Sequence, residues 1–211
     1  MLKNIFNFII LIIFIYILLL SLQPPRFYMW YPTIEKYPNN GTEIGIIREY
    51  INKRGPEDIK FFKLTDSSPL EAFRDKISEK QFRRLTTEKD DRYKKIANKI
   101  TYYQKLFNRA RPAQVAPHLI DSLNSNSDNT PSFPSGHAFH AFYAAKLLSE
   151  WEPHRKKEWD EIAERSANIR VIAGLHYPSD IEFAKKLVTP TEKKNETKHG
   201  DVKAPKRLVS T

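Results

Sequence analysis

The chain has 211 residues and a formal net charge of +10, from 35 Lys and Arg against 25 Asp and Glu. A composition of 40% hydrophobic and 28% charged residues excludes an acidic disordered chain and a multi-span membrane protein. The excess of positive charge favours anionic partners. The absence of cysteine excludes disulfides and thiolate sites, and the absence of G-x-G-x-x-G and G-x-x-x-x-G-K motifs argues against a dinucleotide-binding or P-loop fold.

The N-terminus carries one long apolar block, Ile5 to Leu22, with Lys3 before it. This layout is typical of a signal peptide or a signal anchor, and the block is near the short end of what spans a bilayer. No small-x-small cleavage site follows, so residues 1–22 are predicted to form a hydrophobic helix that anchors the chain in a membrane. A cleaved signal and a buried core helix are the alternatives. A sequon at Asn40 fits a domain on the non-cytosolic side, or a secreted one.

The body between the two ends has the periodicity of helices. Glu43–Lys53 and Leu70–Lys80 are predicted to be short helices, and residues 93–107 place apolar side chains on one helical face. Residues 138–151 are apolar around most of their circumference, which predicts a central buried helix, and residues 159–173 form another helical face. No segment alternates with period two. The fold class is therefore all-α, a single helical-bundle domain over residues 23–188.

Two polar segments flank or interrupt these helices. Residues 121–131 are rich in turn formers and are predicted to be the longest loop. From residue 189 to 211 the chain has few apolar residues and many lysines, which predicts a disordered tail.

Three short segments carry the residues suited to phosphate chemistry. In the first, Pro112 biases Arg111 out of its helix, where a guanidinium can grip two phosphate oxygens. In the second, Ser135 and Gly136 open the buried helix, and free N–H groups at a helix start bind anions. His137 follows in the first turn, where it can protonate a departing alkoxide. A capping serine with a surface histidine is the alternative for this second segment.

The third segment pairs a histidine with a carboxylate. Pro178 is predicted to end a helix near His176, and Ser179 to cap a new helix with Asp180 in its first turn. Asp180 could then hold one ring nitrogen of His176 and leave the other free as a nucleophile or base. Arg170 precedes this pair and adds a second cation. Together the three segments supply donors for a phosphate and two histidines for in-line phosphoryl transfer.

These segments resemble the signature of the type 2 phosphatidic acid phosphatase (PAP2) superfamily, which includes bacterial non-specific acid phosphatases and vanadium haloperoxidases. Its parts are K-x6-R-P, P-S-G-H and S-R-x5-H-x3-D. The intervals agree, with 21 residues between Pro112 and Pro134 and 32 between His137 and Arg170. The resemblance covers about residues 90–185 and implies an all-α bundle of the soluble acid phosphatase branch, which uses no metal or organic cofactor.

Carried over residue by residue, the resemblance implies that His176 attacks phosphorus, Asp180 orients it and His137 protonates the leaving group. It assigns the phosphoryl oxygens to four residues, Arg111, Ser135, Gly136 and Arg170. Two positions depart from the signature. Ile169 replaces a serine, and Gln104 stands where the first motif has its lysine. Lys105, the neighbouring candidate for a phosphate ligand, is one position off and points away from the apolar face of its helix.

The function implied is that of an acid phosphatase that hydrolyses phosphomonoesters through a phosphohistidine, with a small molecule or a lipid phosphate as substrate. One alternative is a weakened or inactive anion-binding member of the superfamily, because Gln104 brings no charge. Another is a vanadate-dependent haloperoxidase-like enzyme. Nucleic-acid binding is disfavoured because the basic residues are spread along the chain. Zinc chemistry is disfavoured because His137 and His140 lack a clear third ligand, and His140 is expected to be a packed helix residue.

Overall fold

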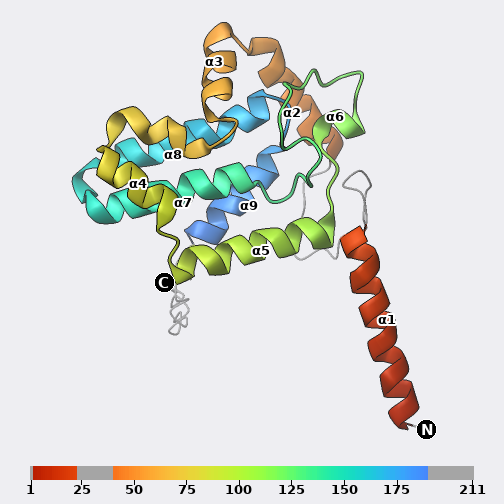
Figure 1. The fold of residues 1–211 in the computed structure, drawn as a ribbon. Coiled ribbons are helices and arrows are strands. Elements are labelled where there is room, and N and C mark those ends of the chain that lie inside the picture. The colour runs from red at the N-terminus through yellow and green to blue at the C-terminus, as the bar shows by residue number, and fades with distance from the viewer. Residues whose placement is uncertain (1, 23–39, 190–211) are drawn as a thin grey trace, which may run out of the picture.

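The computed structural model describes residues 2–22 and 40–189, and Figure 1 shows their arrangement. Within these residues every regular element is helical and no strand occurs, which confirms the all-α prediction. The elements are α1 (Leu2–Leu22), α2 (Asn40–Lys53), α3 (Pro56–Thr65), η1 (Pro69–Lys76), α4 (Glu79–Thr87), α5 (Asp91–Phe107), α6 (Pro112–Val115), α7 (Gly136–Trp151), η2 (Pro153–Arg155), α8 (Lys156–Ile172) and α9 (Pro178–Val188). The predicted disordered tail falls outside the described residues apart from its first residue. The predicted domain boundaries stay predictions.

Helix α7 lies at the centre of the body, where it packs along α8 and against α9 (Figure 1). Its buried alanines, among them Ala138, Ala141 and Ala145, are small enough to let the neighbouring helices approach closely. On α8, Trp159 and Ala163 are one turn apart and fully buried. The prediction of a central buried helix at residues 138–151 is therefore confirmed.

Helix α5 covers one side of α7 through the predicted apolar face. Asp90 caps its start, where the carboxylate accepts a hydrogen bond of 2.7 Å from the Tyr93 amide. Tyr93 packs against Phe139 of α7 with ring centroids 5.2 Å apart, and Ile100 and Phe107 of the same face are buried. The helix predicted from the apolar pattern of residues 93–107 is therefore confirmed.

The predicted helix over Leu70–Lys80 is wrong as a single element. The 3-10 helix η1 ends at Lys76, and α4 begins separately at Glu79. Ser78 explains the break, because its hydroxyl accepts from the Gln81 amide at 3.3 Å while the Gln81 side chain accepts from the Ser78 amide at 2.9 Å. This reciprocal capping box starts a new helix where periodicity alone suggested a continuous one. Helix α3 was not predicted from the sequence at all.

The turn before the His–Asp pair also differs from the prediction. Helix α8 ends at Ile172, not near His176, and Gly174 then adopts a positive φ of 75°. A Cβ at Gly174 would lie 3.1 Å from the Ser122 backbone, so the turn needs glycine. Helix α9 starts at Pro178 with Tyr177 as its N-cap, so Ser179 lies inside the first turn and does not cap it. Pro178 therefore starts the second helix and does not end the first.

Helix α1 extends away from the rest of the chain in Figure 1, and its described side chains, residues 5–18, are largely exposed. Among the described residues, no helix combines the length and the apolarity needed to cross a bilayer. Attachment to a membrane through residues 1–22 stays a prediction.

Candidate active site

The structure brings the three predicted segments together around one buried carboxylate, Asp180. Its Oδ2 accepts hydrogen bonds from the Tyr177 amide at 2.9 Å and from the hydroxyl of Ser132, and its Oδ1 accepts from Arg109 at 2.5 Å. A backbone hydrogen bond adds to these contacts, since the Ser135 amide donates to the Asp180 carbonyl at 3.2 Å. The start of α7 is thereby fixed to the start of α9, and the second motif to the third.

His176 lies against Asp180 as the sequence predicted. Its Nδ1 is 3.3 Å from Asp180 Oδ2, and its Nε2 is 3.2 Å from a guanidinium nitrogen of Arg111. Burial lowers the pKa of His176 to about 3, and the positive charge of Arg111 adds to this effect. Burial alone would raise the pKa of Asp180, but the charge of Arg109 and the hydrogen bonds to this carboxylate lower it to about 2. The ring is therefore neutral, with Nε2 on the side of the cations.

The two predicted arginines are both buried. Arg111 follows the end of α5, which stops at Phe107 because Asn108 adopts a left-handed conformation, with φ of 41°. The Arg111 guanidinium donates to the carbonyls of Leu175, at 2.7 Å, and Thr130, at 2.9 Å. Burial lowers its pKa to about 10, with the charge of Arg170 as the second cause. The two cations are therefore near enough for each to disfavour the charge of the other.

Arg170 is held by residues that belong to none of the three motifs. Its Nη1 donates to Asp66 Oδ1 at 2.6 Å, and its Nη2 donates to the hydroxyls of Ser125 and Ser127 at 3.1 and 2.9 Å. Ser125 also donates to the same Asp66 oxygen at 2.6 Å. An aspartate and two serines thus surround this guanidinium with the type of acceptor that a phosphate would supply.

The N-terminus of α7 lies beside these groups. Ser135 is the N-cap, and its hydroxyl accepts from the Ala138 amide at 3.3 Å, so the alternative of a capping serine is correct for this side chain. A Cβ at Gly136 would meet no atom within 4 Å, which leaves open space above this glycine. The His137 Nε2 is 2.8 Å from the Asp66 carbonyl oxygen, so this ring is not a free surface histidine.

His137 is electrostatically suited to lose its proton. Burial lowers its pKa to about 4, and the charge of Arg170 contributes next, while the Asp66 carbonyl opposes the shift. In the absence of an anion His137 is therefore neutral at neutral pH. A phosphate dianion bound beside it would favour the protonated form, since opposite charges stabilise each other.

The two candidate phosphate ligands of the first motif, Gln104 and Lys105, lie in different environments in the structure. Gln104 points toward the site, and its side-chain amide donates to the Pro134 carbonyl at 3.1 Å. Lys105 is exposed, and the structure does not bring it to the site. The physical reason is the helix itself, because adjacent residues point about 100° apart. Ile169, at the serine position of the signature, is buried against Phe62 and Leu175.

A substitution at Gln104 tests how much phosphate binding is lost because this position lacks the lysine of the first motif. Gln104→Lys is expected to tighten inhibition by phosphate about fivefold, because a charge-assisted hydrogen bond is stronger than a neutral one by about 1 kcal/mol. The inhibition constants of phosphate and vanadate measure this effect. Lys105→Ala is the matched control and should leave them unchanged. A loss of binding in Lys105→Ala, with Gln104→Lys neutral, would contradict the placement of the two side chains.

The sequence analysis did not identify Arg109 and Glu43, which support the site through contacts with Asp180 and Ser179. Arg109 is fully buried and donates to Glu43 of α2 at 2.8 Å as well as to Asp180. Glu43 in turn accepts from the amide and hydroxyl of Ser179, each at 2.8 Å. Arg109 lies two residues before Arg111, inside the first basic segment. Nothing in the sequence, however, indicates that it pairs with a carboxylate 66 residues away.

A metal site is not formed by the described residues, since no group of three or more His, Asp or Glu side chains there could hold an ion.

Residues 98–184 match the model of the PAP2 superfamily. No curated protein matches the chain. Among solved structures, the chain is similar to the crystal structure of the first transmembrane PAP2 type phosphatidylglycerolphosphate phosphatase from Bacillus subtilis, with 15% identity, a TM-score of 0.44 and coverage of 83% of this chain and 90% of that chain. The segment that contains all three motifs thus matches the PAP2 superfamily.

Proposed function

We propose that the protein is a phosphatase that hydrolyses phosphomonoesters through a phosphohistidine on His176, without a metal ion. The observation that carries the proposal is the environment of His176. Asp180 holds one ring nitrogen, and the other lies 3.2 Å from Arg111. A neutral ring with its proton on Nδ1 carries its lone pair on Nε2, and without substrate that lone pair accepts from Arg111. Phosphoryl oxygens that bind the guanidinium would take over this hydrogen bond and free Nε2 for attack.

The reaction takes two steps. In the first, His176 Nε2 attacks phosphorus, the bond from phosphorus to the ester oxygen breaks, and His137 gives its proton to that oxygen to release the alcohol. In the second, His137 takes a proton from water, the resulting hydroxide oxygen bonds to phosphorus, and the bond to His176 breaks to release phosphate. Each atom and proton is accounted for, and His137 returns to its protonated form.

The arginines stabilise the charge that develops on the transferred group. Arg111 and Arg170 are buried, so their attraction for an anion is screened less than it would be in water. Asp66 now occupies one side of Arg170 at 2.6 Å. A phosphate must therefore share or replace this contact, and the carboxylate limits how tightly the product phosphate is held.

The primary test is hydrolysis of an aryl phosphate by the full chain in excess EDTA. Turnover that survives EDTA supports the proposal, whereas activity that is lost in EDTA and restored by a divalent cation contradicts it.

The pH profile provides a second test. His176 must be neutral, above its pKa of about 3, and His137 must be protonated, below its pKa of about 4. After correction for substrate ionisation, kcat/KM is therefore expected to peak between about pH 3 and 4 and to fall about tenfold per unit at higher pH. The fall in kcat should occur at higher pH, because bound phosphate raises the pKa of His137.

The control for this profile is the leaving group. A dinitrophenyl phosphate needs little protonation of its ester oxygen, so the decline at higher pH should be weaker for it than for an alkyl phosphate. An optimum above pH 7 with an alkyl phosphate would contradict the role of His137.

The alternative of an anion-binding member without turnover is favoured by Gln104, which replaces a cation, and by the Asp66–Arg170 ion pair. It predicts that phosphate and vanadate bind while no ester is hydrolysed. The soluble acid phosphatase branch and the vanadate-dependent alternative stay predictions.

We also propose that residues 1–22 attach the protein to a membrane, with the body on the non-cytosolic side. Large apolar side chains, including Phe6, Phe8 and Phe14, are exposed on α1, and exposed apolar surface of this extent is typical of an interaction site. Protein from the membrane fraction is expected to have an intact mass that includes residues 1–22. A soluble chain that begins near Gln23 would instead indicate a cleaved signal.

A further inference from the structure

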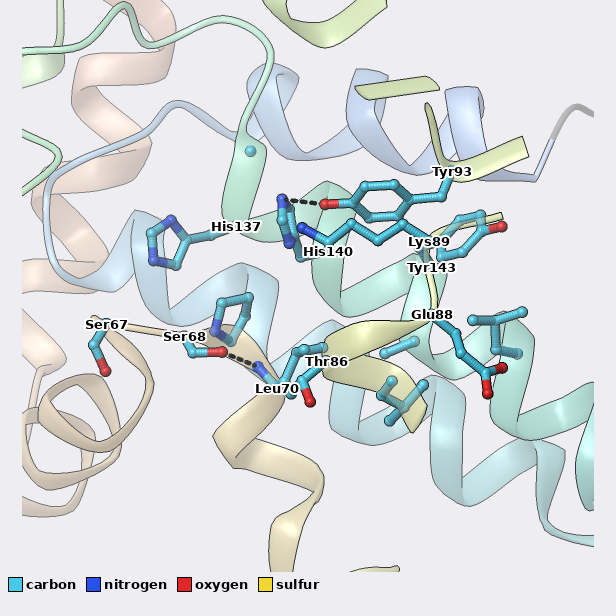
Figure 2. A pocket seen from close by; sticks show the side chains of 15 residues that line it. Ser67, Ser68, Leu70, Thr86, Glu88, Lys89, Tyr93, His137, His140 and Tyr143 are labelled. Atoms are coloured by element: carbon cyan, nitrogen blue, oxygen red, sulfur yellow. Dashed lines mark hydrogen bonds between the residues drawn. The ribbon is translucent and has the colours of Figure 1, made fainter. Parts of the chain in front are cut away.

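A cavity of about 430 Å³ borders the site on the side of His137 (Figure 2). Its walls come from the segment before η1 and the start of η1, the end of α4 with the following loop, the start of α5, and one face of α7. It is lined in part by Ser67, Ser68, Thr86, Lys89, Tyr93 and His137. We call it the α4–α7 cavity.

The position of the α4–α7 cavity suits the leaving group of the proposed reaction. His137 and Gly136 line it, whereas His176, Arg111 and Arg170 do not. In-line transfer places the leaving oxygen on the side of phosphorus opposite to the nucleophile, next to the acid that protonates it. A second cavity reaches Arg111 and Leu175 but is not lined by His137. Of the two cavities, the α4–α7 cavity is therefore the one that adjoins the acid of the proposed mechanism.

The walls suit a compact polar group. Hydroxyl groups of Ser67, Ser68 and Thr86 lie on one side, and Leu85 and Leu147 contribute apolar surface. The volume falls within the usual range of small-molecule pockets. Mixed walls of this kind provide hydrogen bonds for a hydroxylated alcohol as well as contact for its carbon atoms.

The charge of the cavity is positive. The Lys89 ammonium lies 5.0 Å from the centre of the Tyr93 ring, and no carboxylate is within ion-pair distance of it among the described residues. The neighbouring Glu88 is bound by Arg84 at 2.5 Å, so its charge is compensated. In Figure 2 the Lys89 side chain points toward His140.

The neighbouring basic group of the cavity, His140, is neutral at neutral pH. His140 Nε2 is 3.4 Å from the Tyr93 hydroxyl, and burial, followed by the charge of Lys89, lowers the pKa of His140 to about 4. Lys89 therefore provides the cavity with one uncompensated positive charge.

We propose that the α4–α7 cavity binds the leaving alcohol and selects phosphomonoesters whose alcohol carries a second negative charge, which Lys89 attracts. This inference rests on the proposed phosphatase activity. It concerns the identity of the substrate class, which the phosphate-binding residues alone leave open, because every phosphomonoester presents the same phosphoryl group.

Two matched substrate pairs test the inference with the full chain. 3-Phosphoglycerate and glycerol 3-phosphate have nearly the same size and differ by a carboxylate. In mixed micelles, phosphatidylinositol 4-phosphate has an anionic leaving group, whereas phosphatidic acid has a neutral one. The kcat/KM of the anionic member is expected to exceed that of the neutral member about three- to fivefold in at least one pair, as for an exposed ion pair. The pair that shows the preference identifies a soluble or a lipid source.

Lys89→Met should bring the ratio of the two kcat/KM values close to one. The matched control is Lys99→Met, which removes an exposed lysine of α5 that does not line the cavity, and it should keep the preference. Equal kcat/KM values within both pairs, or a preference that persists in Lys89→Met, would overturn the inference while leaving aryl phosphate hydrolysis intact. Absence of hydrolysis with every substrate, aryl phosphate included, would instead refute the proposed function.

Discussion

Replacing His176 with Ala is expected to abolish both turnover and covalent labelling. The proposed mechanism has no other group that forms the bond to phosphorus, so kcat should fall by about 10⁴-fold or more, the scale seen when a nucleophile is removed. The cavity left by the ring is small and the Asp180 contacts to Arg109, Ser132 and Tyr177 remain, so the fold should persist. Turnover with labelled substrate, quenched in alkali, measures the phosphoenzyme, which should be base-stable and acid-labile.

His137→Ala is the matched control for His176→Ala. It removes a histidine from the same site but leaves the nucleophile, so a substrate with a good leaving group should still label the protein. Alkyl phosphates, which need the proton, should react much more slowly. Labelling that persists in His176→Ala, or that is lost in His137→Ala with the good leaving group, would contradict the assigned roles.

Arg109→Met is expected to cause the largest loss of stability. Arg109 is fully buried between two buried carboxylates, at 2.5 Å from Asp180 and 2.8 Å from Glu43. Removing the cation leaves both negative charges uncompensated, which costs about 3–5 kcal/mol. Urea unfolding at neutral pH measures the change. Lys94→Met removes a cation from an exposed ion pair with Asp91, and this control should leave the unfolding midpoint nearly unchanged.

A double variant shows whether the carboxylates cause the loss. Glu43→Gln in the Arg109→Met background removes one of the uncompensated charges and should recover part of the stability. The pH dependence of stability has a defined sign, because folding lowers the pKa of Asp180 from its ordinary value of 3.8 to about 2. The stability that Asp180 contributes is complete above the unfolded pKa and is lost as pH falls through the folded one. An Arg109→Met protein as stable as the parent would refute this role.

The helices could be predicted wherever one face is apolar over several turns. Residues 93–107 and 138–151 have that pattern, and α5 and α7 occupy them. The boundaries that failed depend on capping and turn geometry. Ser78 divides the predicted helix over Leu70–Lys80, and Gly174 ends α8 before His176. Such helix boundaries depend on a single capping contact, and the periodicity of apolar residues does not show that contact.

Two histidines, Asp180 and two arginines could be identified from the sequence, because their types and spacing form a recognisable pattern. The residues that surround them could be identified only in the folded chain. Glu43 reaches Arg109, and Asp66 reaches Arg170, from helices and turns that precede them by 66 and 104 residues. Such contacts depend on how helices pack, and a buried ion pair over that separation has no local signal in the chain. For the same reason the α4–α7 cavity, and Lys89 at its wall, became visible only when α4, α5 and α7 were placed together.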